Sequence, residues 1–211
     1  MRKLFGLCLF TVLALALAGC GGSDERRVFE AAILSDQPAD GDIAFDPVGQ
    51  TFTITNGPDT LFFGIDDSDP NLPEFRAFLD FPLDGSTGQD VVPLAARIIS
   101  ATLEVFIDSV SFAPIIPTLL DLVSYPASGL REEDFDSPPL LTQELDFFAS
   151  DQGRFVSIDV TPLMREAQRL GVADFQVRFL LDLTVDVGLV GIEDQPIVSI
   201  TAPLLTVVYA F

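Results

Sequence analysis

Apolar side chains recur at every second position along most of the chain from about residue 43 onward, and this pattern limits the fold more than any other feature. Alternation with a period of two is typical of strands that place one face against a core and the other toward solvent. The longest examples lie at 75–81, 100–107 and 175–183. Shorter examples cover 51–55, 60–65, 119–125, 141–148, 154–160, 197–201 and 204–209. Glycine, proline and aspartate separate these segments, so the sequence predicts an all-β sandwich or barrel.

One segment departs from the alternation and predicts a short helix. Thr161 is suited to the N-cap, Pro162 to the first helical position and Gly171 to the C-terminal end. The apolar side chains between these signals recur at helical spacing, at Leu163, Ala167 and Leu170. We therefore expect one short helix near residues 162–170, covering an open end or face of the sandwich.

The strong negative charge of the chain excludes several classes of partner. There are 32 acidic and 11 basic residues, which gives a formal net charge of −21. Such a surface repels the phosphate backbone, so no nucleic acid is expected as a partner. It also repels anionic headgroups, so attachment to a membrane must be mainly hydrophobic.

The chain has no histidine, and this limits its chemistry. Ser-His-Asp and Cys-His catalysis and histidine-based zinc or iron sites are excluded. Carboxylate-only catalysis and calcium binding remain. A hydrolase of that kind needs two acids at a defined separation, and with so many acidic residues no pair stands out, so we expect no enzyme.

The first twenty residues have the order of features that is typical of an export signal. Arg2 and Lys3 precede a short apolar run at 4–17, and small residues follow it. The run is too short for a transmembrane helix. The segment ending at Cys20, Leu17-Ala18-Gly19-Cys20, resembles the bacterial lipobox.

The lipobox resemblance implies cleavage before Cys20 and acylation of that residue. Several acyl chains anchor a protein stably where one chain is marginal, so the lipid bilayer is the expected partner of Cys20. Position 21 is Gly21 rather than aspartate. By resemblance to enterobacterial lipoproteins this favours the outer membrane, facing the periplasm or the cell surface. The alternative is an ordinary signal peptide that leaves Cys20 unmodified.

The chain is accordingly divided into three parts. Residues 1–19 form the signal peptide, and residues 20–44 form the lipidated N-terminus and a flexible tether. Gly21, Gly22 and Ser23 begin the tether, and the polar, turn-prone stretch 35–42 continues it. Residues 45–211 form the β-sandwich domain.

Four segments of the chain are similar, in order, to motifs of the DNRLRE family, the disaggregatase-related domains that resemble carbohydrate-binding module 96. Residues 75–83 are similar to its "R-A-hydrophobic-L-x-F-x-L" strand, and residues 95–105 to its "I-x-S-A-x-L-x-L" strand. Residues 155–161 resemble its "D-V-T" junction between strand and helix. Residues 203–209 resemble its closing "P-x-L-x-V-x-Y" strand.

The resemblance implies a jelly-roll-like β-sandwich of antiparallel strands. In some relatives it also implies binding of acidic polysaccharides at cell surfaces. The middle of the family pattern carries tryptophans in a "W-x-E…T-W" stretch. Here Leu130 and Phe135 stand where tryptophan is expected.

An acidic stretch at 66–71 is a candidate calcium site. Calcium takes six to eight oxygen ligands from carboxylates, carbonyls and water. The candidate ligands are Asp66, Asp67, Asp69 and Glu74. The spacing does not match an EF-hand, and a solvated turn between strands is the favoured alternative.

Three aromatic side chains are candidates for a ligand-binding surface, namely Phe78, Phe106 and Tyr125. Phe78 and Phe106 fall on the otherwise polar faces of their strands. Such positions indicate an exposed binding or partner surface, a face turned toward the second sheet, or an additional layer that covers the strand. Exposure of all three side chains together would support ligand binding.

Arginines on the polar strand faces are expected to form cross-strand ion pairs. By alternation Arg76 lies near Asp80, and Arg178 lies near Asp182. Arg131 lies in a second acidic cluster and is expected to pair with a neighbouring carboxylate.

Taken together, these features predict a non-catalytic, membrane-anchored binding or adhesion module of the cell envelope. Its ligand is not identified by the sequence, and a polysaccharide is one candidate. The alternative is a structural or assembly lipoprotein that docks onto another envelope protein. A carboxylate-based glycan-active enzyme is the least favoured hypothesis.

Overall fold

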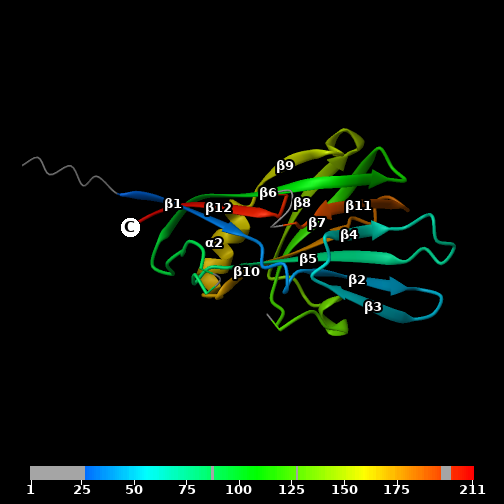
Figure 1. Cartoon of the computed structure of the whole chain (residues 1–211), viewed down its shortest axis with the longest axis horizontal. Helices are drawn as coiled ribbons and strands as arrows, with labels where there is room; N and C mark the ends of the chain where they lie inside the picture. Colours follow the sequence, from blue (N-terminus) through cyan, green and yellow to red (C-terminus); the bar gives the residue numbers. More distant parts are fainter. Residues whose placement is uncertain (1–26, 87, 127, 196–200) are drawn as a thin grey trace, which may run out of the picture.

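The computed structural model describes residues 27–86, 88–126, 128–195 and 201–211. These residues form twelve β-strands, one α-helix and two short 3-10 helices (Figure 1). In chain order the elements are β1 (Val28–Leu34), β2 (Gly41–Asp46), β3 (Thr51–Asn56), β4 (Thr60–Ile65), β5 (Glu74–Pro82), β6 (Arg97–Ser111), β7 (Ile115–Val123), η1 (Glu132–Asp134), β8 (Leu141–Phe148), η2 (Ala149–Asp151), β9 (Arg154–Asp159), α2 (Thr161–Leu170), β10 (Asp174–Leu181), β11 (Gly188–Glu193) and β12 (Leu204–Ala210).

All the strands pair antiparallel in one strongly curled sheet. The main path runs β1-β12-β6-β11-β4-β5-β10-β7-β8, with β2 and β3 attached beside β5 and β9 beside β6. Strand β5 joins the two halves of the sandwich, because its first residues pair with β4 and its later residues pair with β10. The prediction of an all-β, jelly-roll-like sandwich of antiparallel strands with one short helix is confirmed.

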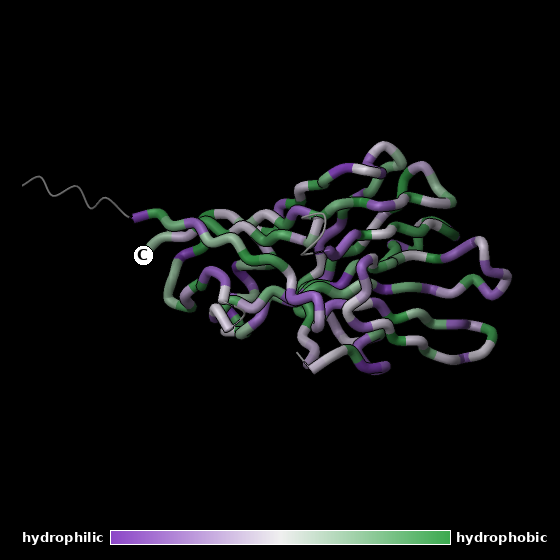
Figure 2. The backbone as a smooth tube through the Cα atoms, viewed as in Figure 1, coloured by the Kyte–Doolittle hydropathy of each residue, from purple (hydrophilic) through white to green (hydrophobic). Residues whose placement is uncertain are grey.

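The period-two pattern of the sequence corresponds to the two faces of the sheet. In β6 the side chains of Leu103, Val105 and Ile107 are fully buried, while Glu104 and Phe106 between them are partly exposed. Figure 2 shows this pattern as short hydrophobic and hydrophilic stretches that follow one another along the strands. The buried side of each half contributes to one main core between the two halves.

A second, smaller core lies on the outer face of the β2-β5-β10-β7 half. It consists of six buried side chains, those of Ile43, Phe78, Val123, Tyr125, Leu130 and Phe135. Part of the chain between β7 and β8 folds back over the sheet to form it, since Leu130 and Phe135 belong to that connection. As a result β5 is buried on both faces from Ala77 to Pro82. Of the environments considered for Phe78, the structure therefore shows an additional layer of chain that covers the strand.

Helix α2 covers one part of the sandwich beside β6. Its C-terminal end is Gly171, whose left-handed φ of 68° lets its amide bond to the carbonyls of Ala167 and Gln168, as predicted. Thr161 does not act as the N-cap, which is Val160. The Thr161 hydroxyl instead bonds to the backbone of Ala101 in β6 and ties the helix to the sheet.

The structure corrects the extent of the predicted tether. Residues 28–44 do not form a tether, because β1 and most of β2 lie within them. Strand β1 pairs with β12 over its whole length, and Ala31 and Ile33 enter the main core. Polar side chains at 35–42 gave the sequence its loop-like character, yet Ser35, Asp40 and Asp42 are buried.

The set of predicted strands was incomplete at three places. Strands β1, β2 and β11 were not predicted, and Gly188 at the start of β11 and Gly191 within it weaken its alternation. The predicted strand at 197–201 lies outside the described residues except for Thr201, which is not in a strand. The predicted signal peptide, the segment that resembles a lipobox and Cys20 also lie outside the described residues.

Candidate functional site

Two of the three predicted ligand-binding aromatic residues lie in the interior. The side chains of Phe78 and Tyr125 are 0% and 6% exposed, and their rings meet edge to face at 5.6 Å. Both belong to the second core, which the connection between β7 and β8 covers. The expectation that Phe78, Phe106 and Tyr125 form one exposed surface is therefore wrong for Phe78 and Tyr125.

Phe106 has a different environment, on the outer face of the other half of the sandwich. It lies directly opposite Phe155 in the β6–β9 pair, and the two rings meet edge to face at 5.1 Å. The side chain of Phe155 is 50% exposed, and that of Phe106 is partly exposed. Phe155 was not singled out from the sequence, although it is the second residue of the predicted strand at 154–160.

Polar side chains border this aromatic pair. Glu104 and Ser157 are the next residues on the same faces of β6 and β9, and the Ser157 hydroxyl lies 3.4 Å from Glu104 Oε2. Glu193 of β11 pairs with Phe106 from the other side. We call the group formed by Phe106, Phe155, Glu104, Ser157 and Glu193 the aromatic face. Exposed rings next to hydroxyl and carboxylate groups can contact an apolar ligand face and bind its hydroxyl groups.

The acidic stretch at 66–71 forms a turn and does not gather its carboxylates around one point. Asp66 Oδ1 accepts hydrogen bonds from the amide and hydroxyl of Ser68, and Asp69 Oδ1 accepts one from the amide of Asn71. These are local aspartate turns, which fold a loop without any ion.

The fourth predicted calcium ligand is engaged elsewhere. Glu74 forms an ion pair with Arg76, with 2.8 Å between Oε1 and Nε. Among the residues that the structure places, no group of three or more acidic or cysteine side chains is arranged to hold a metal ion. The contacts of Asp66, Asp69 and Glu74 therefore fit the solvated turn, in which Asp67 is exposed.

A cleft of about 270 Å³ lies between this turn and the β2–β3 hairpin. Its lining residues are Ala44, Asp46, Thr53, Thr55, Asp69, Asn71, Pro73 and Phe75. The Asn71 side-chain amide donates to Asp46 Oδ2 at 3.2 Å and ties the two walls together. Hydrogen bonds from the amides of Gly49 and Val48 hold the pKa of Asp46 below its usual value. Figure 1 shows that the hairpin turn lies at the opposite end of the molecule from the start of β1.

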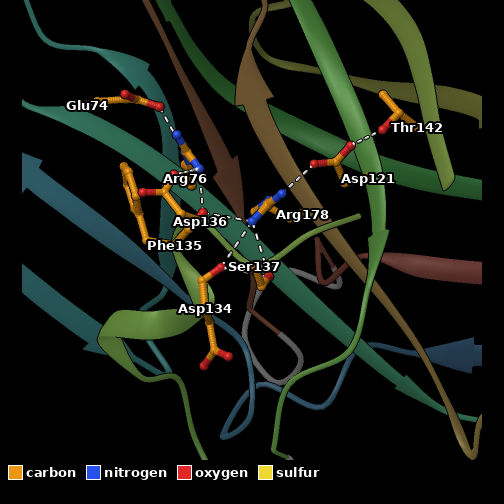
Figure 3. A network of polar contacts seen from close by, with 9 residues as sticks. All are labelled: Glu74, Arg76, Asp121, Asp134, Phe135, Asp136, Ser137, Thr142 and Arg178. Atoms are coloured by element: carbon orange, nitrogen blue, oxygen red, sulfur yellow. Dashed lines mark hydrogen bonds and ion pairs between the residues drawn. The ribbon is translucent and has the colours of Figure 1, made fainter. Parts of the chain in front are cut away.

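A network of arginine contacts holds the β7–β8 connection against the sheet (Figure 3). Arg178 of β10 pairs with Asp121 of β7 at 2.6 Å, and both side chains are buried. The same guanidinium donates to the carbonyls of Asp134 and Phe135 at 3.1 and 2.7 Å. Asp121 also accepts a hydrogen bond from the Thr142 hydroxyl at 2.5 Å.

Arg76 supports the same connection from β5. It pairs with Asp136 at 3.0 Å, donates to the Phe135 carbonyl, and places its guanidinium carbon 3.8 Å from the centre of the Phe135 ring. The expectation of a cross-strand ion pair is confirmed for Arg178, which pairs with Asp121 on the neighbouring strand. Neither Asp80 nor Asp182, the carboxylates that lie near the two arginines by alternation, is the partner. Residues four apart on one strand are about 13 Å apart, whereas neighbouring strands are about 5 Å apart.

Arg131 was expected to pair with a neighbouring carboxylate. Its backbone amide donates to Asp134 Oδ2 at 2.7 Å, and this contact closes the turn of η1. Within the described ranges its guanidinium takes part in no ion pair.

Three buried aspartates lie where the chain passes from β1 to β2. Asp40 accepts a hydrogen bond from the amide of Asp80 at 2.6 Å, and Ser35 donates to Asp194 at 3.1 Å. Burial and the nearby charge of Asp174 raise the pKa of Asp80 to about 7, and burial raises the pKa of Asp194 to about 6. Burial and then the charge of Asp194 raise the pKa of Asp40. Their exposed fractions are at most 1%, so a substrate cannot reach them.

No family model matches the sequence. A search of the curated proteins likewise finds no relative. The resemblance to DNRLRE domains therefore stays a prediction that rests on the quoted motifs. No helix in the described segments combines the length and apolar character that a membrane crossing requires.

Proposed function

We propose that this chain is a non-catalytic lipoprotein of the cell envelope that is anchored through acylated Cys20 and binds a ligand on the aromatic face. The observation that carries the binding role is the pair Phe106 and Phe155, held side by side on an outer sheet surface between Glu104, Ser157 and Glu193. The lipobox Leu17-Ala18-Gly19-Cys20 supports the anchor.

A polysaccharide suits the chemistry of the aromatic face. The C–H side of a sugar ring packs on an exposed phenylalanine, and sugar hydroxyls donate to the carboxylates of Glu104 and Glu193. The acidic character of the whole chain favours neutral or cationic sugars over acidic ones, because acidic groups would be repelled. This differs from the acidic polysaccharides that the family resemblance implies.

A catalytic role has less support. Hydrolysis by carboxylates needs an acid of raised pKa beside the scissile bond. The carboxyl groups with the largest rise in pKa, those of Asp40, Asp80 and Asp194, lie inside the fold away from any substrate.

The binding proposal is tested with the acylated protein and an array of neutral, cationic and acidic polysaccharides, with calcium and with a chelator. Phe155→Ala should lower the affinity for the bound sugar about fivefold or more, since truncating a residue that anchors a ligand typically costs more than about 1 kcal/mol. Phe148→Ala is the matched control, because Phe148 is similarly exposed on β8. Equal binding by the Phe155→Ala variant and the wild type would exclude the aromatic face as the site.

A docking role toward another envelope protein is favoured by a second observation. Ile115 and Phe148 are paired across β7 and β8, and both side chains are more than two-fifths exposed. Capture of one defined envelope protein by the wild type, and its loss with Phe148→Ala while polysaccharide binding is absent, would support this alternative.

A further inference from the structure

The end of the molecule where the described chain begins carries an exposed apolar surface. Its exposed side chains are Val28, Phe29, Val91, Leu94, Leu170 and Phe211. They come from the start of β1, the chain after β12, the loop before β6 and the last residue of α2. We call this surface the anchor-side end. Figure 1 shows the start of β1 and the C-terminus at the same end of the molecule, and in Figure 2 the first residues of β1 are hydrophobic.

Contacts between the termini show that the first part of this surface is continuous. The Phe29 ring stacks on Tyr209 at 5.5 Å and meets the edge of Phe211 at 5.8 Å. The Tyr209 hydroxyl lies 3.3 Å from the carbonyl of Val91 and links the termini to the loop before β6.

The loop before β6 continues the surface to helix α2. Val91, Leu94 and Val172 line an apolar cavity of about 320 Å³ that is partly open to solvent. The Gln168 side chain of α2 donates to the Pro93 carbonyl at 3.2 Å and holds the loop to the helix. Apolar surface that remains exposed in this way is typical of contact with a partner or a membrane.

Arginines lie beside the apolar side chains of the anchor-side end. Segments 91–101, 160–173 and 203–211 hold three arginines and one acidic residue, Glu166, while Glu30 of β1 and Asp84 and Asp90 of the loop before β6 bring further carboxylates to this end. The three arginines, Arg97, Arg165 and Arg169, line an open cavity together with Leu94. Arginine binds phosphate groups through a planar fork of donors, so apolar side chains beside arginines suit the phosphate level of a bilayer.

The proposed lipid anchor keeps this end close to the bilayer. Val28 follows Cys20 by eight residues. Even a fully extended chain of eight residues spans only about 28 Å. A domain of this size has a radius of gyration of roughly 16 Å, so the anchor alone confines the start of β1 to within about one domain diameter of the membrane.

We propose that the anchor-side end docks on the phospholipid bilayer into which Cys20 is inserted. Val28, Leu94 and Phe211 enter the headgroup region, and the three arginines contact lipid phosphates. This inference rests on the proposed lipid anchor and adds a fixed orientation to it. The cleft at the β2–β3 hairpin then faces away from the membrane.

The orientation is measured with the acylated full-length protein in vesicles of phosphatidylethanolamine and phosphatidylglycerol. Because the two cysteines of the chain are Cys8 in the signal and Cys20 at the anchor, a nitroxide label can be attached to one introduced cysteine. Leu94→Cys reports the anchor-side end. Val48→Cys in the β2–β3 turn is the control, and both parent side chains are well exposed, at 62% and 71%.

Docking predicts that the label at position 94 collides several-fold more often with lipid-soluble oxygen, relative to a water-soluble nickel chelate, than the label at position 48. Equal ratios at the two positions in a protein whose Cys20 is acylated would overturn the docked orientation and leave the lipid anchor intact. An unmodified Cys20 thiol in the mass spectrum would overturn the anchor and the docking together. Vesicle binding alone is not the readout, because acyl chains retain the protein whatever its orientation.

Discussion

Arg178 and Asp121 face each other across β10 and β7 and form a 2.6 Å ion pair that is buried on the outer side of the sheet. Arg178 also holds the carbonyls of Asp134 and Phe135, so this pair fastens the β7–β8 connection that covers the second core. The covering layer thus depends on a charged contact and on an apolar one, and the two can be tested separately.

Removing the carboxylate of Asp121 should destabilise the protein strongly. Asp121→Ala leaves the Arg178 charge buried without its partner, and such a change typically costs about 3–5 kcal/mol of the free energy of unfolding. Denaturation by urea measures this loss. The control is Glu166→Ala, which breaks the exposed pair of Glu166 with Arg169 and should have little effect. A double variant in which Leu replaces Asp121 and Met replaces Arg178 should be more stable than Asp121→Ala.

Truncating a side chain of the second core should cost nearly as much as truncating one in the main core. Phe78 is fully buried between β5 and the covering connection. Phe78→Ala should lower the free energy of unfolding by about 3–5 kcal/mol, because it leaves a cavity. Phe112→Ala, at an exposed position in the β6–β7 turn, should change it little. If Phe78 were instead an exposed ligand contact, its replacement would leave the denaturation midpoint unchanged.

The buried aspartates predict that the protein gains stability as the pH falls from 8 to about 5. The folded-state pKa of Asp80 is about 7 and that of Asp194 is about 6, above the usual 3.8 of the unfolded chain. The folded protein therefore retains protons that the unfolded chain has lost, and stability declines as the pH rises through these values. The reduced repulsion among the other carboxylates acts in the same direction.

The variant Asp80→Asn separates these two contributions. It removes the cost of ionising a buried carboxyl, so at pH 8 it should be more stable than the wild type by roughly 2–4 kcal/mol. The difference should shrink toward pH 5, where Asp80 is protonated in the folded state. Thermal melts at a series of pH values measure this. Parallel curves for the two proteins would show that Asp80 does not cause the pH dependence.

The anchor predicts a change of location that does not depend on the fold. Cys20→Ser removes the thiol to which we propose that diacylglycerol is attached, so the protein should move from the membrane fraction to the soluble fraction after cell breakage. Its thermal unfolding should remain that of the wild type, because the sandwich begins at Val28. Continued membrane association of the Cys20→Ser variant would argue against lipidation as the anchor.

The sequence by itself determined the all-β class, the helix near residues 162–170 and its end at Gly171. Each depends on local chemistry, namely a period-two pattern along one strand or the left-handed conformation that glycine adopts at a helix end. The same local pattern failed at β1, whose first three residues are exposed, and at β2, which carries the buried Asp42. Both strands are fixed by pairing with β12 and β5, which lie far away in the sequence.

The tertiary structure alone decided which aromatic residues are exposed and which charges meet. Phe78 and Phe106 occupy equivalent positions in their alternating segments, yet the β7–β8 connection covers Phe78 and leaves Phe106 open beside Phe155. In the same way Arg178 meets Asp121 on the next strand rather than Asp182 on its own. Alternation assigns a side chain to a face of the sheet, but the strands and loops that pack against that face decide its neighbours and its contact with water.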